Sequence, residues 1–196
     1  GTWGHAGSYS FSPNKTITTG QGGIAVTRDK HIFEGLRMLK DQGRPVRGSG
    51  GDDIHHTRGY NFKFTNLQAA VGLGQLHYLN QRIARMREIY AWYAEGLKDL
   101  KNAALYPCDL DGGAVPQWTD IKLERRDELE AYLRERNIDS RKYWHPLHRQ
   151  APYKKSDEQF TNSIALSKSS LWLPSAFMLS RADIETVCRN IKTFLN

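Results

Sequence analysis

A long helical pattern in the centre of this 196-residue sequence constrains its fold more than any other feature. Residues 65–100, "TNLQAAVGLGQLHYLNQRIARMREIYAWYAEGLKDL", carry apolar side chains at helical spacing throughout. Thr65 or Asn66 is a suitable N-cap, and a break near Leu79 and Asn80 would divide the stretch into two helices. The pattern therefore predicts a helical region between two parts of different texture.

The part before the helical region predicts two strands and a helix. "GSYSFS" (7–12) reads as a short strand, and "GGIAVT" (22–27) reads as a second, buried strand. "DKHIFEGLRMLKDQG" (29–43) follows, with Asp29 as a helix N-cap and Gly43 as the C-terminal stop. This order of strand, loop, strand and helix is typical of part of an α/β layer.

Residues 43–58, "GRPVRGSGGDDIHHTR", predict a loop, because they contain four glycines, one proline and little apolar content. Loops of this length inside a domain are usually functional or mobile. The adjacent pair His55 and His56 lacks the helical or hairpin spacing of typical metal sites, so no metal site is predicted here.

Beyond residue 100 the pattern becomes that of a small α+β domain. "QWTDIKLE" (117–124) and "IDSRKYW" (138–144) read as strands, and "RRDELEAYLRERN" (125–137) reads as a helix. Two more helices are predicted in "QFTNSIALSKSSLWLP" (159–174) and in the C-terminal segment after Ser180, its N-cap. The predicted domains are residues 1–85, part of a larger domain, and 86–196, a small C-terminal domain.

Composition narrows the classes of function. The formal charge is +7, but the basic residues are interleaved with acids and no nucleic-acid motif is visible, so nucleic-acid binding is not predicted. A phosphorylated small molecule is enough to explain the excess of positive charge. No apolar run long enough to cross a membrane and no leader peptide are visible, and the two cysteines, Cys108 and Cys188, suit a reducing cytoplasm.

The segment "SFSPNKTITTGQGG" (10–23) holds one lysine, Lys15, between hydroxyl residues and glycines. Such a lysine can be an ordinary surface-loop residue. Alternatively, hydroxyl and amide donors beside it could bind a phosphate, which is the arrangement that a lysine enzyme with a phosphorylated aldehyde cofactor needs. The spacing does not match a Walker-type nucleotide loop.

Four segments in order resemble the DegT/DnrJ/EryC1/StrS family, the sugar-nucleotide aminotransferases that use pyridoxal phosphate. They are "SFSPNKTITTGQGGIAVT" (10–27), "RGYNFKFTNLQAAVGLGQL" (58–76), "YWHPLHRQAPY" (143–153) and "LWLPSAFMLSRADIETV" (171–187). The resemblance implies an α/β fold of the aspartate aminotransferase type (fold type I). It covers only the C-terminal half of the family, and details such as "LPS" (173–175) favour the perosamine-synthase branch.

The resemblance also implies roles for four residues. Lys15 would be joined covalently to the cofactor and would move protons, and Ser10 would contact the cofactor phosphate. Asn61 would reach the cofactor of a neighbouring subunit in a homodimer, and His148 would lie near the substrate. From the residues alone, Ser10 ends a strand, Asn61 caps the following helix and His148 packs against Tyr153.

The implied reaction moves an amino group, with glutamate as donor, to a nucleotide-linked keto-sugar. The alternatives are a sugar dehydratase with the same cofactor, which the family pattern associates with histidine in place of Lys15, and a non-catalytic regulatory relative. The aspartate that pairs with the pyridine nitrogen and the ring that stacks on the cofactor are expected in the half that this sequence does not include. Lys63 stands where the family usually has arginine, so a substrate role is not carried over to it.

Overall fold

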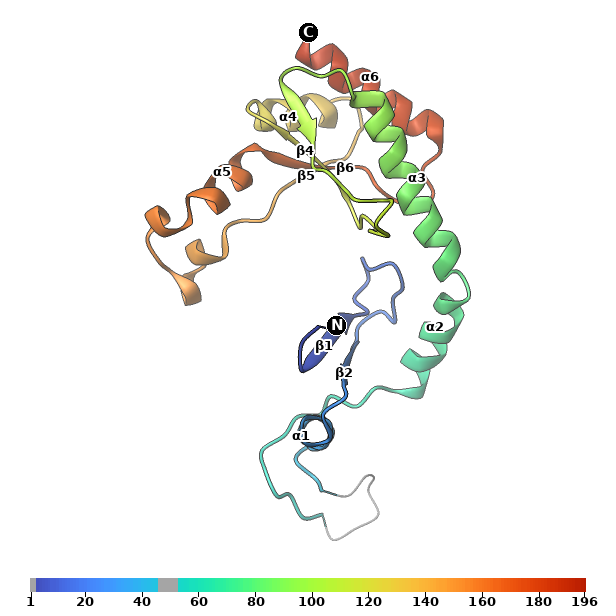
Figure 1. Ribbon diagram of the computed structural model, residues 1–196, viewed down its shortest axis with the longest axis vertical. Coiled ribbons are helices and arrows are strands. Elements are labelled where there is room, and N and C mark those ends of the chain that lie inside the picture. Colours follow the sequence, from blue (N-terminus) through green and yellow to red (C-terminus); the bar gives the residue numbers. More distant parts are fainter. Residues whose placement is uncertain (1–2, 46–52) are drawn as a thin grey trace. The chain divides into compact units, whose positions relative to one another are not determined.

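The structure is a computed structural model that describes residues 3–45 and 53–196. Figure 1 shows the chain, which forms two compact units, Gly1–Asn80 and Gln81–Asn196. The α/β fold predicted from the sequence is confirmed. Residues 46–52 of the predicted loop at 43–58 lie outside the described residues.

The first unit begins with an antiparallel pair of strands, β1 (Ala6–Ser10) and β2 (Gly23–Thr27), in which Ser10 lies opposite Gly23. Both strands were predicted, but the expectation that the second is buried was wrong. The Ile24 side chain is 48% exposed. A sheet of only these two strands has too few neighbours to bury its faces.

Helix α1 (Lys30–Lys40) begins and ends as its sequence predicts. The Asp29 carboxylate accepts hydrogen bonds from the backbone N–H groups of His31 and Ile32. At the other end, the N–H of Gly43 donates to the carbonyl of Met38 over 2.8 Å, which is the hydrogen bond of a Schellman motif. Gly43 has a φ of +82°, and a Cβ there would lie 1.8 Å from the carbonyl oxygen of Thr57.

The central helical region forms α2 (Asn66–Leu76) and α3 (Leu79–Leu97), so the predicted break is confirmed. Thr65 caps α2 in a capping box with Gln68, in which each side chain bonds the other residue's backbone N–H. The apolar residues of α2 are exposed, and Leu67 and Leu73 are 76% and 70% exposed.

The second unit is an antiparallel sheet with helices on one face. The strand order is β3 (Ala103–Leu105), β4 (Thr119–Leu123), β6 (Ser170–Leu173) and β5 (Arg141–Lys142). Alternate residues of β4 and β6 point into a core shared with α3, α4 (Arg126–Arg134) and α6 (Arg181–Leu195). The capping box of Ser180 with Asp183 starts α6, as predicted from the sequence.

Two parts of this unit differ from the sequence prediction. "QFTNSIALSKSSLWLP" is not one helix: α5 (Thr161–Ser169) ends where the central strand β6 begins. The fully buried Leu171 and Leu173 need the alternation of a strand to reach the core, and this tertiary packing overrides the helical pattern. The expected strand at 138–144 is reduced to Arg141–Lys142.

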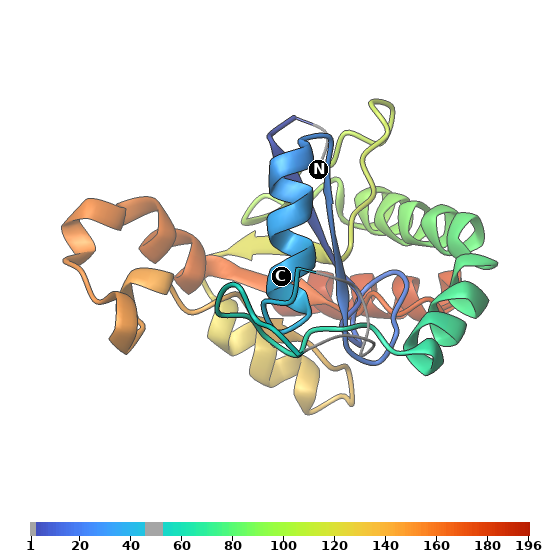
Figure 2. The same ribbon diagram turned by 90° about the horizontal axis from the view of Figure 1, so that it is seen from below.

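The sequence also gave no indication of β3 or of three short 3₁₀ helices. These helices are η1 (Leu147–Arg149), η2 (Ala151–Tyr153) and η3 (Asp157–Phe160). Together with α5 they project from one end of the sheet, as the views of Figures 1 and 2 both show.

Hydrophobic burial is distributed unevenly between the units. Among the described residues, every buried hydrophobic side chain lies in the second unit, from Met86 onward. The first unit instead exposes large apolar side chains on α2 and on residues 60–64. Exposed apolar surface of this extent is typical of an interaction surface. Within the described chain, no helix has both the length and the hydropathy needed to cross a membrane.

Candidate active site

The Lys15 loop, residues 11–22, leaves β1 and returns into β2 with its two ends tied together. The backbone N–H of Phe11 donates to the carbonyl of Gly22 over 2.9 Å, and the N–H of Thr19 donates to the carbonyl of Phe11 over 3.1 Å. The Thr18 hydroxyl also donates to the Phe11 carbonyl, over 3.0 Å. Because its base is fixed in this way, the loop presents Lys15 from a defined turn and not from a free segment.

Hydroxyl and amide groups line the first half of this loop. The Ser10 and Ser12 hydroxyl oxygens lie 3.0 Å apart, and the Ser12 hydroxyl donates to the Asn14 side-chain oxygen over 3.2 Å. The N–H of Lys15 donates to the carbonyl of Ser12 over 3.1 Å, and the Lys15 side chain is partly buried. Ser10 and Lys15, both predicted from the sequence, thus belong to one hydrogen-bonded turn.

Gly22 allows the loop to close against a second segment. Its φ is +152°, and a Cβ there would lie 2.5 Å from a ring carbon of Phe64 and 2.7 Å from the Thr19 hydroxyl oxygen. The rings of Phe11 and Phe64 have centroids 6.4 Å apart, and the Gln68 side chain donates to the carbonyl of Gln21 over 2.8 Å. The fold therefore brings "SFSPNK" beside the end of "GYNFKF", which lies far along the sequence.

The donor set of the loop fits the phosphate end of an aldehyde cofactor. Ser10 and Ser12 place two hydroxyl groups together at the start of the turn, and such groups bind phosphate oxygens well once they exchange their present hydrogen bonds for the phosphate. Lys15, three residues beyond Ser12, supplies a primary amine that can join an aldehyde carbon. Ser10 also ends β1, so its strand position and its proposed cofactor role are compatible.

Asn61 lies in the segment that docks on the end of α1. It forms an isolated antiparallel bridge with Asp41, and the neighbouring N–H of Phe62 donates to the carbonyl of Lys40 over 3.0 Å. The Asn61 side chain is exposed, and Thr65, not Asn61, caps the following helix. The contribution of Asn61 to a partner's site stays a prediction.

Asp41 is a residue that the sequence analysis missed. Its side chain is only 8% exposed, and its Oδ1 lies 2.9 Å from Nζ of Lys63 and 3.8 Å from the Arg44 guanidinium. The ion pair gives Lys63 a structural partner at the place where the family usually has arginine. His55 is engaged nearby, since its Nδ1 lies 2.7 Å from the carbonyl oxygen of Gln42.

His148 lies in the second unit and is buried, with 5% of its surface exposed. Its Nε2 is 3.1 Å from Oδ1 of Asp157, and its ring stacks on Phe160 with centroids 4.4 Å apart. The Arg149 guanidinium also pairs with Asp157, and its hydrogen bond, with that of His148, lowers the pKa of this carboxyl to about 2. The geometry gives His148 a role in holding η1 against η3; its predicted contact with substrate stays a prediction.

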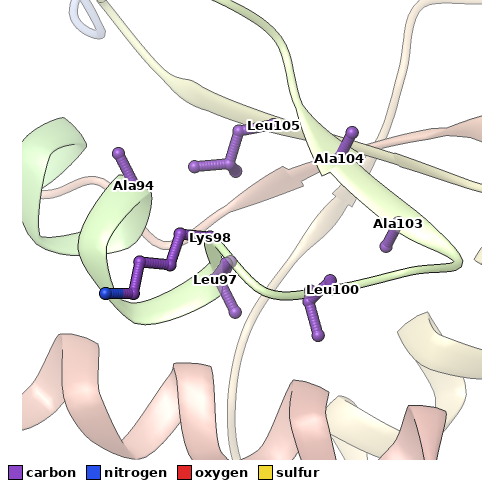
Figure 3. A pocket seen from close by; sticks show the side chains of 7 residues that line it. All are labelled: Ala94, Leu97, Lys98, Leu100, Ala103, Ala104 and Leu105. Carbon is purple, nitrogen blue, oxygen red and sulfur yellow. The ribbon is translucent and has the colours of Figure 1, made fainter.

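A cavity of about 210 Å³ lies in the second unit between the end of α3 and β3 (Figure 3). It is lined by alanine and leucine side chains together with Lys98. Typical small-molecule sites start at roughly 300 Å³ and contain several convergent polar groups. This cavity is smaller than such sites, and its lining residues do not include an acid–base pair for catalysis.

Comparison with known proteins identifies relatives over almost the whole chain. The profile of the DegT/DnrJ/EryC1/StrS aminotransferase family matches residues 1–192. A GDP-perosamine synthase of Escherichia coli O157:H7 is 32% identical over 99% of this chain and 53% of its own length. A dTDP-3-amino-3,4,6-trideoxy-alpha-D-glucose transaminase of Streptomyces venezuelae is 33% identical over 74% of this chain and 38% of its own.

A solved structure agrees with these relatives. A DegT DnrJ EryC1 StrS aminotransferase from Brucella abortus is 30% identical and superposes with a TM-score of 0.85 over 98% of this chain and 52% of its own. The chain thus spans about half the length of the proteins it matches. The enzymes of this family depend on pyridoxal phosphate.

Proposed function

Because the chain belongs to the DegT/DnrJ/EryC1/StrS aminotransferase family, we propose that the full protein transfers an amino group to a nucleotide-linked keto-sugar. The observation that carries the proposal is the position of Lys15 in a turn whose base is tied to both strands and whose flank offers Ser10 and Ser12 hydroxyls. Glutamate is the proposed donor, and the amino sugar is proposed to serve cell-surface polysaccharide or deoxyaminosugar synthesis.

Lys15 and Ser10 have separate proposed roles in this turn. Lys15 would hold the cofactor through its Nζ and, when that nitrogen is free, would accept a proton and return it. The Ser10 hydroxyl would donate to the phosphate and so help to orient the cofactor toward Lys15. Bound there, pyridoxal phosphate supplies the electron sink that makes a hydrogen beside the amino nitrogen acidic.

Two further proposals concern assembly and location. The exposed apolar residues of α2 support a homodimer in which Asn61 reaches the cofactor phosphate of the partner subunit. The part of the relatives that this chain does not match is a second candidate to cover the same apolar surface. Cys108 and Cys188 are both unpaired, which supports action in the cytoplasm.

The test begins with the absorbance of the full-length protein after addition of pyridoxal phosphate. We expect a visible band that differs from that of the free cofactor, and its loss in Lys15→Ala. Lys30→Ala, at an exposed lysine of the same unit, is the matched control and retains the band. A band that persists in Lys15→Ala contradicts the assignment of Lys15.

Product analysis then separates the proposed reaction from its alternatives. With a keto-sugar nucleotide and glutamate, an aminotransferase forms an amino sugar and 2-oxoglutarate together. A dehydratase forms a deoxygenated sugar that carries no new amino nitrogen; the two electrons for this deoxygenation come from an added reductant or from glutamate, whose nitrogen is then released as ammonia. A regulatory relative binds ligand without forming product. The relatives named GDP-perosamine synthase support GDP-linked sugars as the first substrates to test.

A further inference from the structure

The sheet of the second unit packs one face against helices, and its other face carries a row of charged and aromatic side chains. Trp172 of β6 lies directly opposite Asp120 of β4 and opposite Arg141 of β5. Residues directly opposite each other in antiparallel strands project to the same face. The neighbouring Leu171 and Leu173 project to the other face and enter the core. Asp120, Trp172 and Arg141 therefore stand side by side, away from the core.

Two more indole rings pack against Trp172. Trp118 stacks parallel to it, with ring centroids 4.4 Å apart and an angle of 7°. Trp144 stands edge-on to Trp172, at 4.8 Å and 81°. Trp172 is buried, whereas Trp144 remains 52% exposed. The buried indole thus supports an outer indole that faces solvent.

Arg141 completes this surface, which we term the tryptophan–arginine platform (Arg141, Trp118, Trp144 and Trp172). The centre of its guanidinium lies 5.2 Å from the Trp144 ring and 5.0 Å from the Trp172 ring. Among the described residues Arg141 forms no ion pair, whereas the adjacent Lys142 pairs with Asp127. A guanidinium that is held by ring faces keeps its N–H donors available for an anion.

We propose that the platform binds the nucleoside diphosphate part of the substrate, with Arg141 on the phosphate oxygens and the exposed Trp144 ring stacked on the base. The assignment of a nucleotide rests on the proposed function. The chemistry of a nucleoside diphosphate matches the platform in two respects. A planar guanidinium binds phosphate oxygens in pairs, and any nucleobase offers a flat ring to an indole.

Calorimetric titration of the full-length protein with GDP, guanosine and inorganic pyrophosphate tests the proposal. Arg141→Ala is expected to weaken GDP and pyrophosphate binding by about tenfold or more, with little effect on guanosine. Trp144→Ala is expected to weaken GDP and guanosine by about fivefold or more and to spare pyrophosphate. Arg189→Ala, at an exposed arginine of α6 in the same unit, is the matched control for the loss of charge.

Two results would overturn the proposal. One is GDP affinity that is unchanged in both Arg141→Ala and Trp144→Ala. The other is that acrylamide does not quench the fluorescence of Trp144 in the nucleotide-free protein. The contribution of Trp144 is the difference in quenching between wild type and Trp144→Phe. That result would mean that other parts of the protein cover the platform. Arg141→Lys guards against misfolding, because it keeps the charge and is expected to bind with intermediate affinity.

The experiment also separates this proposal from the proposed function. If Lys15 takes up the cofactor and amino transfer proceeds while both platform variants bind GDP normally, the platform is wrong and the function stands. If GDP binding follows the platform variants but Lys15 does not react with the cofactor, the platform stands and the function is wrong.

Discussion

Asp120 provides a quantitative test of the second unit, because burial disfavours its charged form. Its Oδ1 is buried without a hydrogen-bond partner, and desolvation raises the pKa of this carboxyl from 3.8 to about 6. The folded state therefore holds the Asp120 proton more tightly than the unfolded state does. The resulting stability is fully present below pH 3.8, and it is lost as pH rises through about 6.

The size of the effect follows from the two pKa values of Asp120. The gap between 3.8 and about 6 corresponds to about 3 kcal/mol of unfolding free energy. Because the side chain keeps some contact with solvent, we halve this figure to about 1.5 kcal/mol. Asp120→Asn removes the charge, so we expect it to raise the unfolding free energy by about 1.5 kcal/mol at pH 8 and by only a few tenths at pH 4.

The assay is urea denaturation at pH 4 and pH 8, followed by tryptophan fluorescence, to which the stacked indoles Trp118 and Trp172 of the second unit contribute. Asp139→Asn, at an exposed aspartate of the same unit, is the control and is expected to show no such difference. Comparing each variant with wild type at the same pH cancels the other titrating groups. A gain that is equal at both pH values, or a loss at pH 8, refutes the reasoning about Asp120.

Two further predictions concern the first unit. Mixing full-length Lys15→Ala with full-length Asn61→Ala should restore roughly half of the site activity in heterodimers, because one of the two sites then carries neither substitution; no recovery after proven subunit exchange would show that Asn61 does not serve a partner's site. Gly22→Ala should lower cofactor affinity about tenfold, because the new Cβ would lie 2.5 Å from a ring carbon of Phe64 and force the loop open. Phe64→Leu in the same chain should recover part of the affinity, and an unchanged affinity in Gly22→Ala would contradict the proposed closure.

The elements that sequence predicts well are those whose signals are local. Asp29, Thr65 and Ser180 start their helices through side-chain caps that depend only on neighbouring residues. The Lys15 loop also lies between two strands with recognisable patterns, and its residues resemble a known family. Confirmed predictions of this kind required no information on tertiary contacts.

The features that sequence did not predict depend on contacts between distant residues. The strand β6 is formed because Leu171 and Leu173 pack into a core with α3 and α6, which no local pattern of "SSLWLP" indicates. Likewise, Asp41 has no signal of its own as a buried carboxylate. Its role follows only from Lys63, which the fold brings to within 2.9 Å. The stacking of His148 on Phe160 is a further contact that no local pattern indicates, and the contact of His148 with substrate stays a prediction.

The measurement that tests the central claim most directly is mass mapping of the protein after borohydride reduction in the presence of pyridoxal phosphate. Reduction fixes any covalent link between a lysine and the aldehyde. We expect one modified peptide, containing Lys15, and its disappearance in Lys15→Ala with Lys30→Ala as the unaffected control. An unmodified Lys15, or stable modification at a different lysine, would contradict the assignment of this turn as the cofactor site.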